Sequence, residues 1–171
     1  MKDVFLVYDT SCFYEIVILN YFMSVTGCDM VFCSLDGKAV RTTEGFSVNV
    51  DMPLKEVDKK QIRSLIIPGG DIAEIDNEDV KRYLQELNER KVLIAGICAG
   101  VDVLDHAGIL QHGKSTHSTD DDLVCDDTVI TARANAYVDF AIEVARKLDL
   151  FDSEEDLRET IDFWKKFKRV N

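Results

Sequence analysis

Hydrophobic and polar positions along the chain follow two different periods, which separate predicted strands from predicted helices. Short apolar or alternating runs, typical of strands, occupy residues 4–8, 30–35, 46–50, 64–67, 92–97 and 128–131. Apolar residues spaced three and four apart predict helices over about 13–25, 80–90, 101–107, 137–148 and 153–168. The segment 46–50 alternates apolar with polar residues, so we expect an exposed or edge strand there.

The order of these elements indicates the fold class. Strands alternate with helices along most of the chain, as they do in a parallel sheet whose crossovers are helical. The run 92–97 is apolar throughout, which is typical of a central parallel strand. We therefore expect an α/β three-layer sandwich, with a mostly parallel sheet covered by helices on both faces.

Length and composition favour one compact unit. The chain has 171 residues with 46% apolar content, which suffices for a hydrophobic core, and no repeat or linker interrupts it. We expect a single domain over 1–171 that ends in the amphipathic helix at about 153–168.

The charge and the cysteines limit the partners and the compartment. A formal net charge of −12, from 20 basic and 32 acidic residues, argues against nucleic acid and anionic membranes as partners. The longest uncharged apolar-rich run is residues 16–28, shorter than the roughly 20 residues that span a bilayer. Five cysteines form an odd set without a CxxC pair, which favours a reducing cytoplasm.

Two glycine-rich turns at predicted strand ends carry the candidate chemistry. One is Pro68-Gly69-Gly70, and the other is a G-x-C-x-G sequence over residues 96–100 that places Cys98 between a strand and a helix. Glycines on both sides suit a sharp elbow that exposes a nucleophile. The helix amino terminus predicts a lowered pKa for Cys98, and the N–H groups of Ala99 and Gly70 are candidates for an oxyanion hole. The alternative is an inert, buried cysteine.

No pattern indicates a metal or a cofactor. Histidines and cysteines lack the spacing of metal ligands, and no glycine loop of the phosphate-binding type is present. The acidic run 120–122 is interpreted as a solvated loop. We expect no metal and no cofactor.

Several of these segments, taken in order, resemble the ThiJ/PfpI superfamily. They are residues 65–70, 95–100, 107–110, 113–117, 129–133 and 139–141, and the resemblance covers about residues 3–150. This superfamily includes the parkinsonism-associated protein deglycase and bacterial glyoxalase III. The resemblance implies a flavodoxin-like, class I glutamine amidotransferase-like fold and a homodimer.

The resemblance also implies two further site residues. Glu15 corresponds to the family's acid in the first helix, where a protonated carboxyl hydrogen-bonds the cysteine, and its apolar neighbours favour a raised pKa. His117 corresponds to a histidine near the cysteine that acts as a base or orients substrate. The alternatives are that Glu15 is a solvated helix residue and that His117 has a structural role. For His106 and His112 we expect structural roles.

Departures from the family pattern argue against protease, amidotransferase and isocyanide hydratase activity. Ala99 stands where PfpI-type proteases carry histidine, and no H-x-E sequence of the amidotransferase type occurs. Isocyanide hydratases usually have threonine after the cysteine and aspartate at the Glu15 position. Ala134 and Asn135 replace a glycine and a proline that many relatives place beside the pocket.

The leading hypothesis is therefore a stress-response enzyme in which Cys98 adds to a small reactive carbonyl, as in glyoxalase III or a deglycase, with Glu15 and His117 moving protons. The first alternative is a non-enzymatic redox sensor or chaperone-like protein that works through oxidation of Cys98. The second is a cysteine-dependent amidase or hydrolase.

Overall fold

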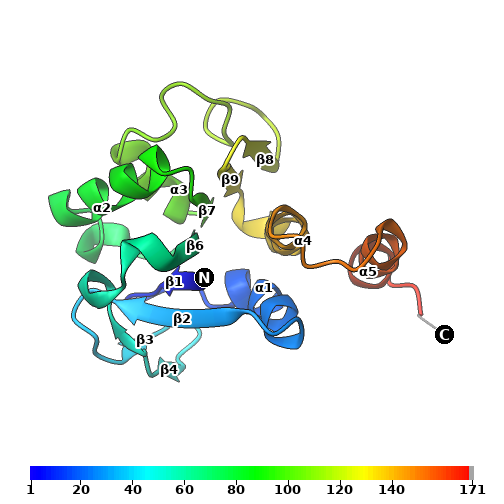
Figure 1. Ribbon diagram of the computed structural model, residues 1–171, viewed down its shortest axis with the longest axis horizontal. Helices are drawn as coiled ribbons and strands as arrows, with labels where there is room; N and C mark the ends of the chain where they lie inside the picture. The colour runs from blue at the N-terminus through cyan, green and yellow to red at the C-terminus, as the bar shows by residue number, and fades with distance from the viewer. Residues whose placement is uncertain (170–171) are drawn as a thin grey trace.

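The computed structural model describes residues 1–169 and has a seven-stranded sheet at its centre (Figure 1). The strand order is β5-β2-β1-β6-β7-β9-β8, and every pair is parallel except β8–β9. The strands are β1 (Lys2–Leu6), β2 (Asp29–Ser34), β5 (Met52–Pro53), β6 (Ile62–Ile67), β7 (Leu93–Ile97), β8 (Leu123–Asp126) and β9 (Val129–Ala132). The predicted fold class, a mostly parallel sheet between layers of helices, is confirmed.

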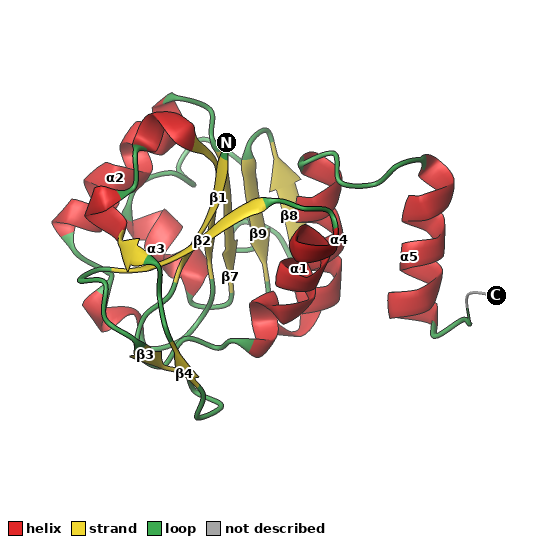
Figure 2. Ribbon diagram, turned by 60° about the horizontal axis from the view of Figure 1, so that its bottom comes forward, coloured by secondary structure: helices red, strands yellow, loops and turns green. Residues whose placement is uncertain are grey.

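Helices cover both faces of the sheet. They are α1 (Tyr14–Val25), α2 (Glu78–Glu89), α3 (Gly100–His106), α4 (Tyr137–Lys147) and α5 (Glu154–Lys166). Helices α1 and α4 pack on one face and α2 and α3 on the other, while α5 stands outside α4 at the edge of the molecule (Figure 2). Between residues 1 and 169, no helix has the length and apolar character needed to cross a bilayer.

Strand β1 shows why the sheet needs both layers. Val4 and Leu6 belong to the core cluster under α2 and α3, whereas Phe5 and Val7, the residue that follows β1, belong to the cluster under α1 and α4. All four side chains are fully buried, as the period of two along a strand requires when both faces are covered.

The segment 46–50 differs from the expectation in length. Only β4 (Ser47–Val48) forms, and it pairs antiparallel with β3 (Val40–Arg41) in a hairpin separate from the main sheet. The hairpin lies next to the loop between β1 and α1, because Thr10 N–H donates to Arg41 O over 2.7 Å. The hairpin therefore lies near the carboxyl end of β1, where the chain leads into α1.

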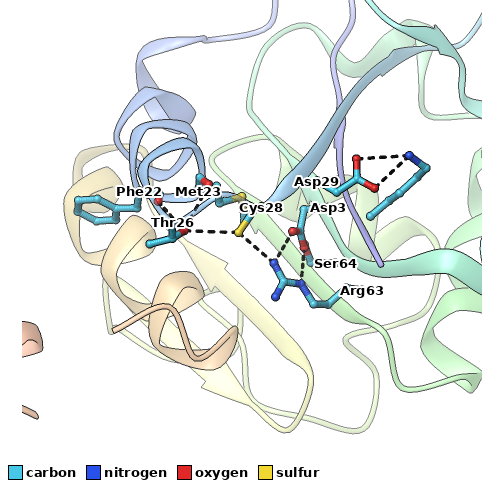
Figure 3. Close-up of polar contacts among 9 residues, drawn as sticks. Asp3, Phe22, Met23, Thr26, Cys28, Asp29, Arg63 and Ser64 are labelled. Atoms are coloured by element: carbon cyan, nitrogen blue, oxygen red, sulfur yellow. Dashed lines mark hydrogen bonds and ion pairs between the residues drawn. The ribbon is translucent and has the colours of Figure 1, made fainter. Parts of the chain in front are cut away.

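An ion pair between a buried carboxylate and a partly exposed guanidinium joins the amino ends of β1 and β6 (Figure 3). Asp3 is fully buried and accepts hydrogen bonds from Arg63 Nε at 2.9 Å and Arg63 Nη2 at 2.5 Å, as well as from Ser64 Oγ at 2.7 Å. The same Nη2 lies 3.1 Å from Cys28 Sγ. Because the charged carboxylate has three donors, its burial is compensated.

The opposite, carboxyl-terminal edge of the sheet collects the candidate site residues. The loops that follow β1, β6 and β7 meet there, since these strands are parallel neighbours. The Tyr8 hydroxyl, just after β1, donates to Pro68 O over 2.8 Å and so ties the first loop to the second. Cys98 follows β7 at the same edge.

Candidate active site

Cys98 occupies a strained elbow between β7 and α3. Its φ is +56°, in the left-handed region that non-glycine residues rarely adopt, and its N–H donates to Ala132 O over 2.9 Å. Gly100 allows the turn, because a Cβ at that position would lie 2.3 Å from Ile67 O. The turn leaves the thiol partly exposed at the edge of the sheet.

Glu15 lies in the first turn of α1 and faces the same point. Only 1% of its surface is exposed. Its Oε2 accepts a hydrogen bond of 2.6 Å from Gly69 N–H, and its Oε1 accepts one of 3.3 Å from the Tyr14 hydroxyl. A Cβ on Gly69 would lie 2.8 Å from Cys98 Sγ and 2.9 Å from Glu15 Oε2. The thiol and the carboxyl therefore both lie against Gly69.

Burial raises the pKa of Glu15, although hydrogen bonds from Gly69, Cys98 and Tyr14 oppose the shift. Burial also raises the pKa of the Cys98 thiol, to about 11, and the nearby Glu15 carboxylate raises it further while the Ala99 N–H lowers it. The expectation that Cys98 has a lowered pKa is therefore wrong. Helix α3 has only seven residues, so its amino terminus offsets little of the desolvation and charge repulsion.

The two groups titrate as a pair. A charged Glu15 repels a thiolate, whereas a neutral Glu15 donates a hydrogen bond to it, so ionisation of one group disfavours ionisation of the other. The thiolate therefore forms most readily when Glu15 holds the proton. A thiol beside a carboxyl can support nucleophilic addition when the carboxyl carries the proton.

The two candidate oxyanion donors lie beside this pair. The Ala99 N–H lowers the pKa of Cys98 and so favours negative charge at the sulfur. Gly70 has φ +143°, and a Cβ there would lie 2.6 Å from Thr10 O, so only glycine fits the close approach of the two loops. Among residues 1–169, none accepts a hydrogen bond from the Gly70 N–H.

His117 contacts α3. Its Nε2 lies 3.2 Å from Asp102 Oδ1, and its Nδ1 lies 3.4 Å from Asp105 Oδ2, with 38% of the side chain exposed. The imidazole is therefore held by two carboxylates of α3. His106 pairs with Asp76 over 2.9 Å.

Three residues beside the site were not predicted from the sequence. Tyr14 reaches Glu15, as described above, and its own N–H donates to Glu44 Oε1 over 2.8 Å. Cys12 N–H donates to Gly69 O over 2.8 Å, and the Cys12 thiol contributes to the raised pKa of Cys98. Of these residues, only Tyr14 could have been found from the sequence, because it is adjacent to Glu15. Glu44 is brought to the site by the fold of the hairpin.

Comparison with known proteins identifies a family for this chain. The DJ-1/PfpI family matches residues 1–147. A deglycase of Thermococcus kodakarensis is 32% identical over 92 residues, which is 53% of this chain and 55% of the relative, so the chain matches about half of that relative's length. A glutathione-independent glyoxalase of Caenorhabditis elegans is 26% identical over 157 residues, covering 79% of this chain and 81% of that protein.

The solved structure of a DJ-1 superfamily protein from Agrobacterium tumefaciens superposes with a TM-score of 0.87 at 26% identity, over 98% of this chain and 100% of that one. Oxidized DJ-1 from Toxoplasma gondii superposes with a TM-score of 0.81 at 21% identity, over 94% and 95% of the two chains, and shows the shared fold. Since the family match includes every strand of the sheet, the chain belongs to the DJ-1/PfpI family.

Proposed function

We propose that this protein is a cofactor-independent cysteine enzyme that acts on small reactive carbonyls, of which 2-oxoaldehydes are the simplest. The observation that carries the proposal is the placement of the Cys98 thiol and the buried Glu15 carboxyl against Gly69. Relatives named deglycase and glyoxalase support the substrate class.

The first step is addition of the thiol to the aldehyde carbon. Glu15 takes the Cys98 proton, the thiolate sulfur bonds to the carbon, and the carbonyl electrons move onto its oxygen. The N–H groups of Ala99 and Gly70 stabilise that oxyanion, and Glu15 then gives it the proton. The product is a neutral hemithioacetal on Cys98, with Glu15 again ionised.

The second step moves a hydrogen between the two substrate carbons. The Glu15 carboxylate removes the proton from the former aldehyde carbon and returns it to the neighbouring carbon through an enediolate. The hydroxyl proton passes to the second oxygen, which leaves a thioester on Cys98. Water hydrolyses the thioester, so the products are a 2-hydroxy acid and the free thiol.

The test is conversion of methylglyoxal to lactate without added thiol. We expect wild-type protein to turn over, Cys98→Ala to be inactive, and Glu15→Gln to lose about 10²-fold or more in kcat/KM, the scale of general acid–base catalysis. Cys125→Ala is the matched control, because Cys125 lies on the edge strand β8 and should leave turnover unchanged. The role of His117 is tested in parallel with His117→Ala. Folded wild-type protein without turnover on any 2-oxoaldehyde or glycated substrate would exclude the enzyme.

A redox sensor is the second candidate, favoured by the partial exposure of Cys98 next to a carboxyl that can hydrogen-bond an oxidised sulfur. Limited peroxide should then oxidise Cys98 to a sulfinic acid ahead of the other four cysteines. Oxidation spread evenly over all five, measured by peptide mass spectrometry, would argue against this reading.

We also propose a cytoplasmic homodimer that associates through α1. Tyr14, Val17, Tyr21 and Val25 are each 45–63% exposed and recur on one side of that helix. All five cysteines are free thiols, in keeping with a reducing compartment. We expect twice the chain mass in light scattering, and monomer for Val17→Asp but not for Phe167→Asp, a control beyond α5. A monomeric wild type would contradict the dimer.

A further inference from the structure

The Glu15 carboxyl is held from two sides by hydrogen-bond donors. Gly69 N–H binds Oε2 at 2.6 Å, and the Tyr14 hydroxyl binds Oε1 at 3.3 Å. The Gly69 donor belongs to the backbone and is fixed by the loop. The Tyr14 hydroxyl is therefore the side-chain donor that keeps the second oxygen in place.

These two donors restrict where the carboxyl can direct its own proton. Each carboxyl oxygen already accepts one hydrogen bond, and the Cys98 thiol lies beside the carboxyl against Gly69. The sulfur is thus a neighbouring group with which Glu15 can exchange a proton. We infer that Tyr14 is a positioning residue that orients the Glu15 carboxyl toward Cys98 and stabilises its ionised form, an inference that rests on the proposed pairing of Glu15 with Cys98.

Tyr14 is itself held by contacts that do not involve its hydroxyl. Its N–H donates to Glu44 Oε1 over 2.8 Å at the start of α1. Its ring packs edge-to-face on Tyr137, with centroids 5.6 Å apart and an interplanar angle of 83°. Phenylalanine at this position would keep both contacts and remove only the oxygen. Tyr14→Phe therefore isolates the hydrogen bond.

The surroundings of Glu15 determine the sign of the effect. The titratable groups around it come from β1 and its loop, α1, the hairpin and the elbow, and they are Tyr8, Cys12, Tyr14, Glu44 and Cys98. The Tyr14 hydrogen bond lowers the pKa of Glu15 and so works against burial, while the charge of Glu44 raises it. Removing the Tyr14 hydroxyl should raise the Glu15 pKa.

The experiment is a ¹³C NMR titration of protein labelled at the glutamate carboxyl carbons, in which the Glu15 signal is the one absent from Glu15→Gln. We expect Tyr14→Phe to raise the Glu15 midpoint by about one pH unit, the scale of one hydrogen bond to a charged group. Tyr21→Phe is the matched control, because Tyr21 lies about two turns along α1 and should leave the midpoint unchanged. An unchanged midpoint in folded Tyr14→Phe overturns the inference.

A second readout follows the thiol instead of the carboxyl. A higher Glu15 pKa favours the state with a protonated carboxyl and a thiolate, so Cys98 alkylation by iodoacetamide at pH 7 should be about tenfold faster in Tyr14→Phe. A merely structural role would not raise the reactivity of a folded protein. Both measurements are independent of turnover. Absence of carbonyl activity with these shifts present would refute the proposed function alone, and turnover without them would refute the role of Tyr14 alone.

Discussion

Replacing Gly69 with alanine inserts one methyl group between the Cys98 thiol and the Glu15 carboxyl. The new Cβ would lie 2.7 Å from Cys98 Cβ, 2.8 Å from Cys98 Sγ and 2.9 Å from Glu15 Oε2. Because nonbonded heavy atoms settle at roughly 3.5–4.0 Å, the thiol must move by about 1 Å. A displacement of this size costs about 10²-fold in rate, and overpacking costs about 1–3 kcal/mol of stability.

Two assays on the same protein separate these effects. The rate of Cys98 alkylation and the turnover of methylglyoxal report the site, and urea unfolding reports stability. Gly27→Ala is the matched control, because Gly27 has φ +73° with nothing within 4 Å of a new Cβ, so it adds backbone strain without crowding. Turnover and alkylation at wild-type rates in Gly69→Ala would refute the reasoning, since the two groups would then not depend on their contact across this glycine.

Three further predictions concern charge. Arg63→Leu leaves the buried Asp3 carboxylate with the Ser64 donor alone, so it should lower the free energy of unfolding by about 3–5 kcal/mol in urea titration; a loss below about 1 kcal/mol would show that solvent replaces the guanidinium. Glu15→Gln removes a charge that raises the Cys98 pKa, so the midpoint of Cys98 alkylation should lie at lower pH in this variant than in wild type, and an unchanged midpoint would contradict the coupling. Burial raises the Glu15 pKa, so the folded state keeps this proton at a pH where the unfolded chain has lost it, and stability falls as pH rises through the folded pKa. Glu15→Gln should therefore gain stability relative to wild type as the pH rises above the ordinary glutamate pKa of 4.5 and through the raised folded pKa, and a difference that stays constant with pH would exclude that linkage.

The sequence predicted the parts of the fold that depend on periodic patterns. The apolar run 92–97 became β7 and the helical spacing from Val80 became α2, because burial on two faces or on one face leaves a distinct period. Strands β5 and β8 were not predicted. They lie at the two edges of the sheet, where two to four residues pair mainly through backbone atoms and leave little trace in side-chain pattern.

The candidate site also has parts that the sequence predicts and parts that it does not. Cys98 carries a local signal in its flanking glycines, and Glu15 is placed by family resemblance. Their contact with Gly69 depends on three loops that converge from distant parts of the chain. The direction of the Cys98 pKa shift could not be predicted, because desolvation and the distance to Glu15 are properties of the assembled structure.

The elbow at Cys98 has a consequence for protein engineering. A non-glycine residue at φ +56° carries a conformational cost of about 1–2 kcal/mol that glycine would avoid. A selection that rewards only thermal tolerance should therefore enrich glycine at residue 98, at the expense of the nucleophile. Libraries of this protein that are meant to combine heat resistance with catalysis should keep Cys98 constant, because stability favours glycine at this position and catalysis requires cysteine.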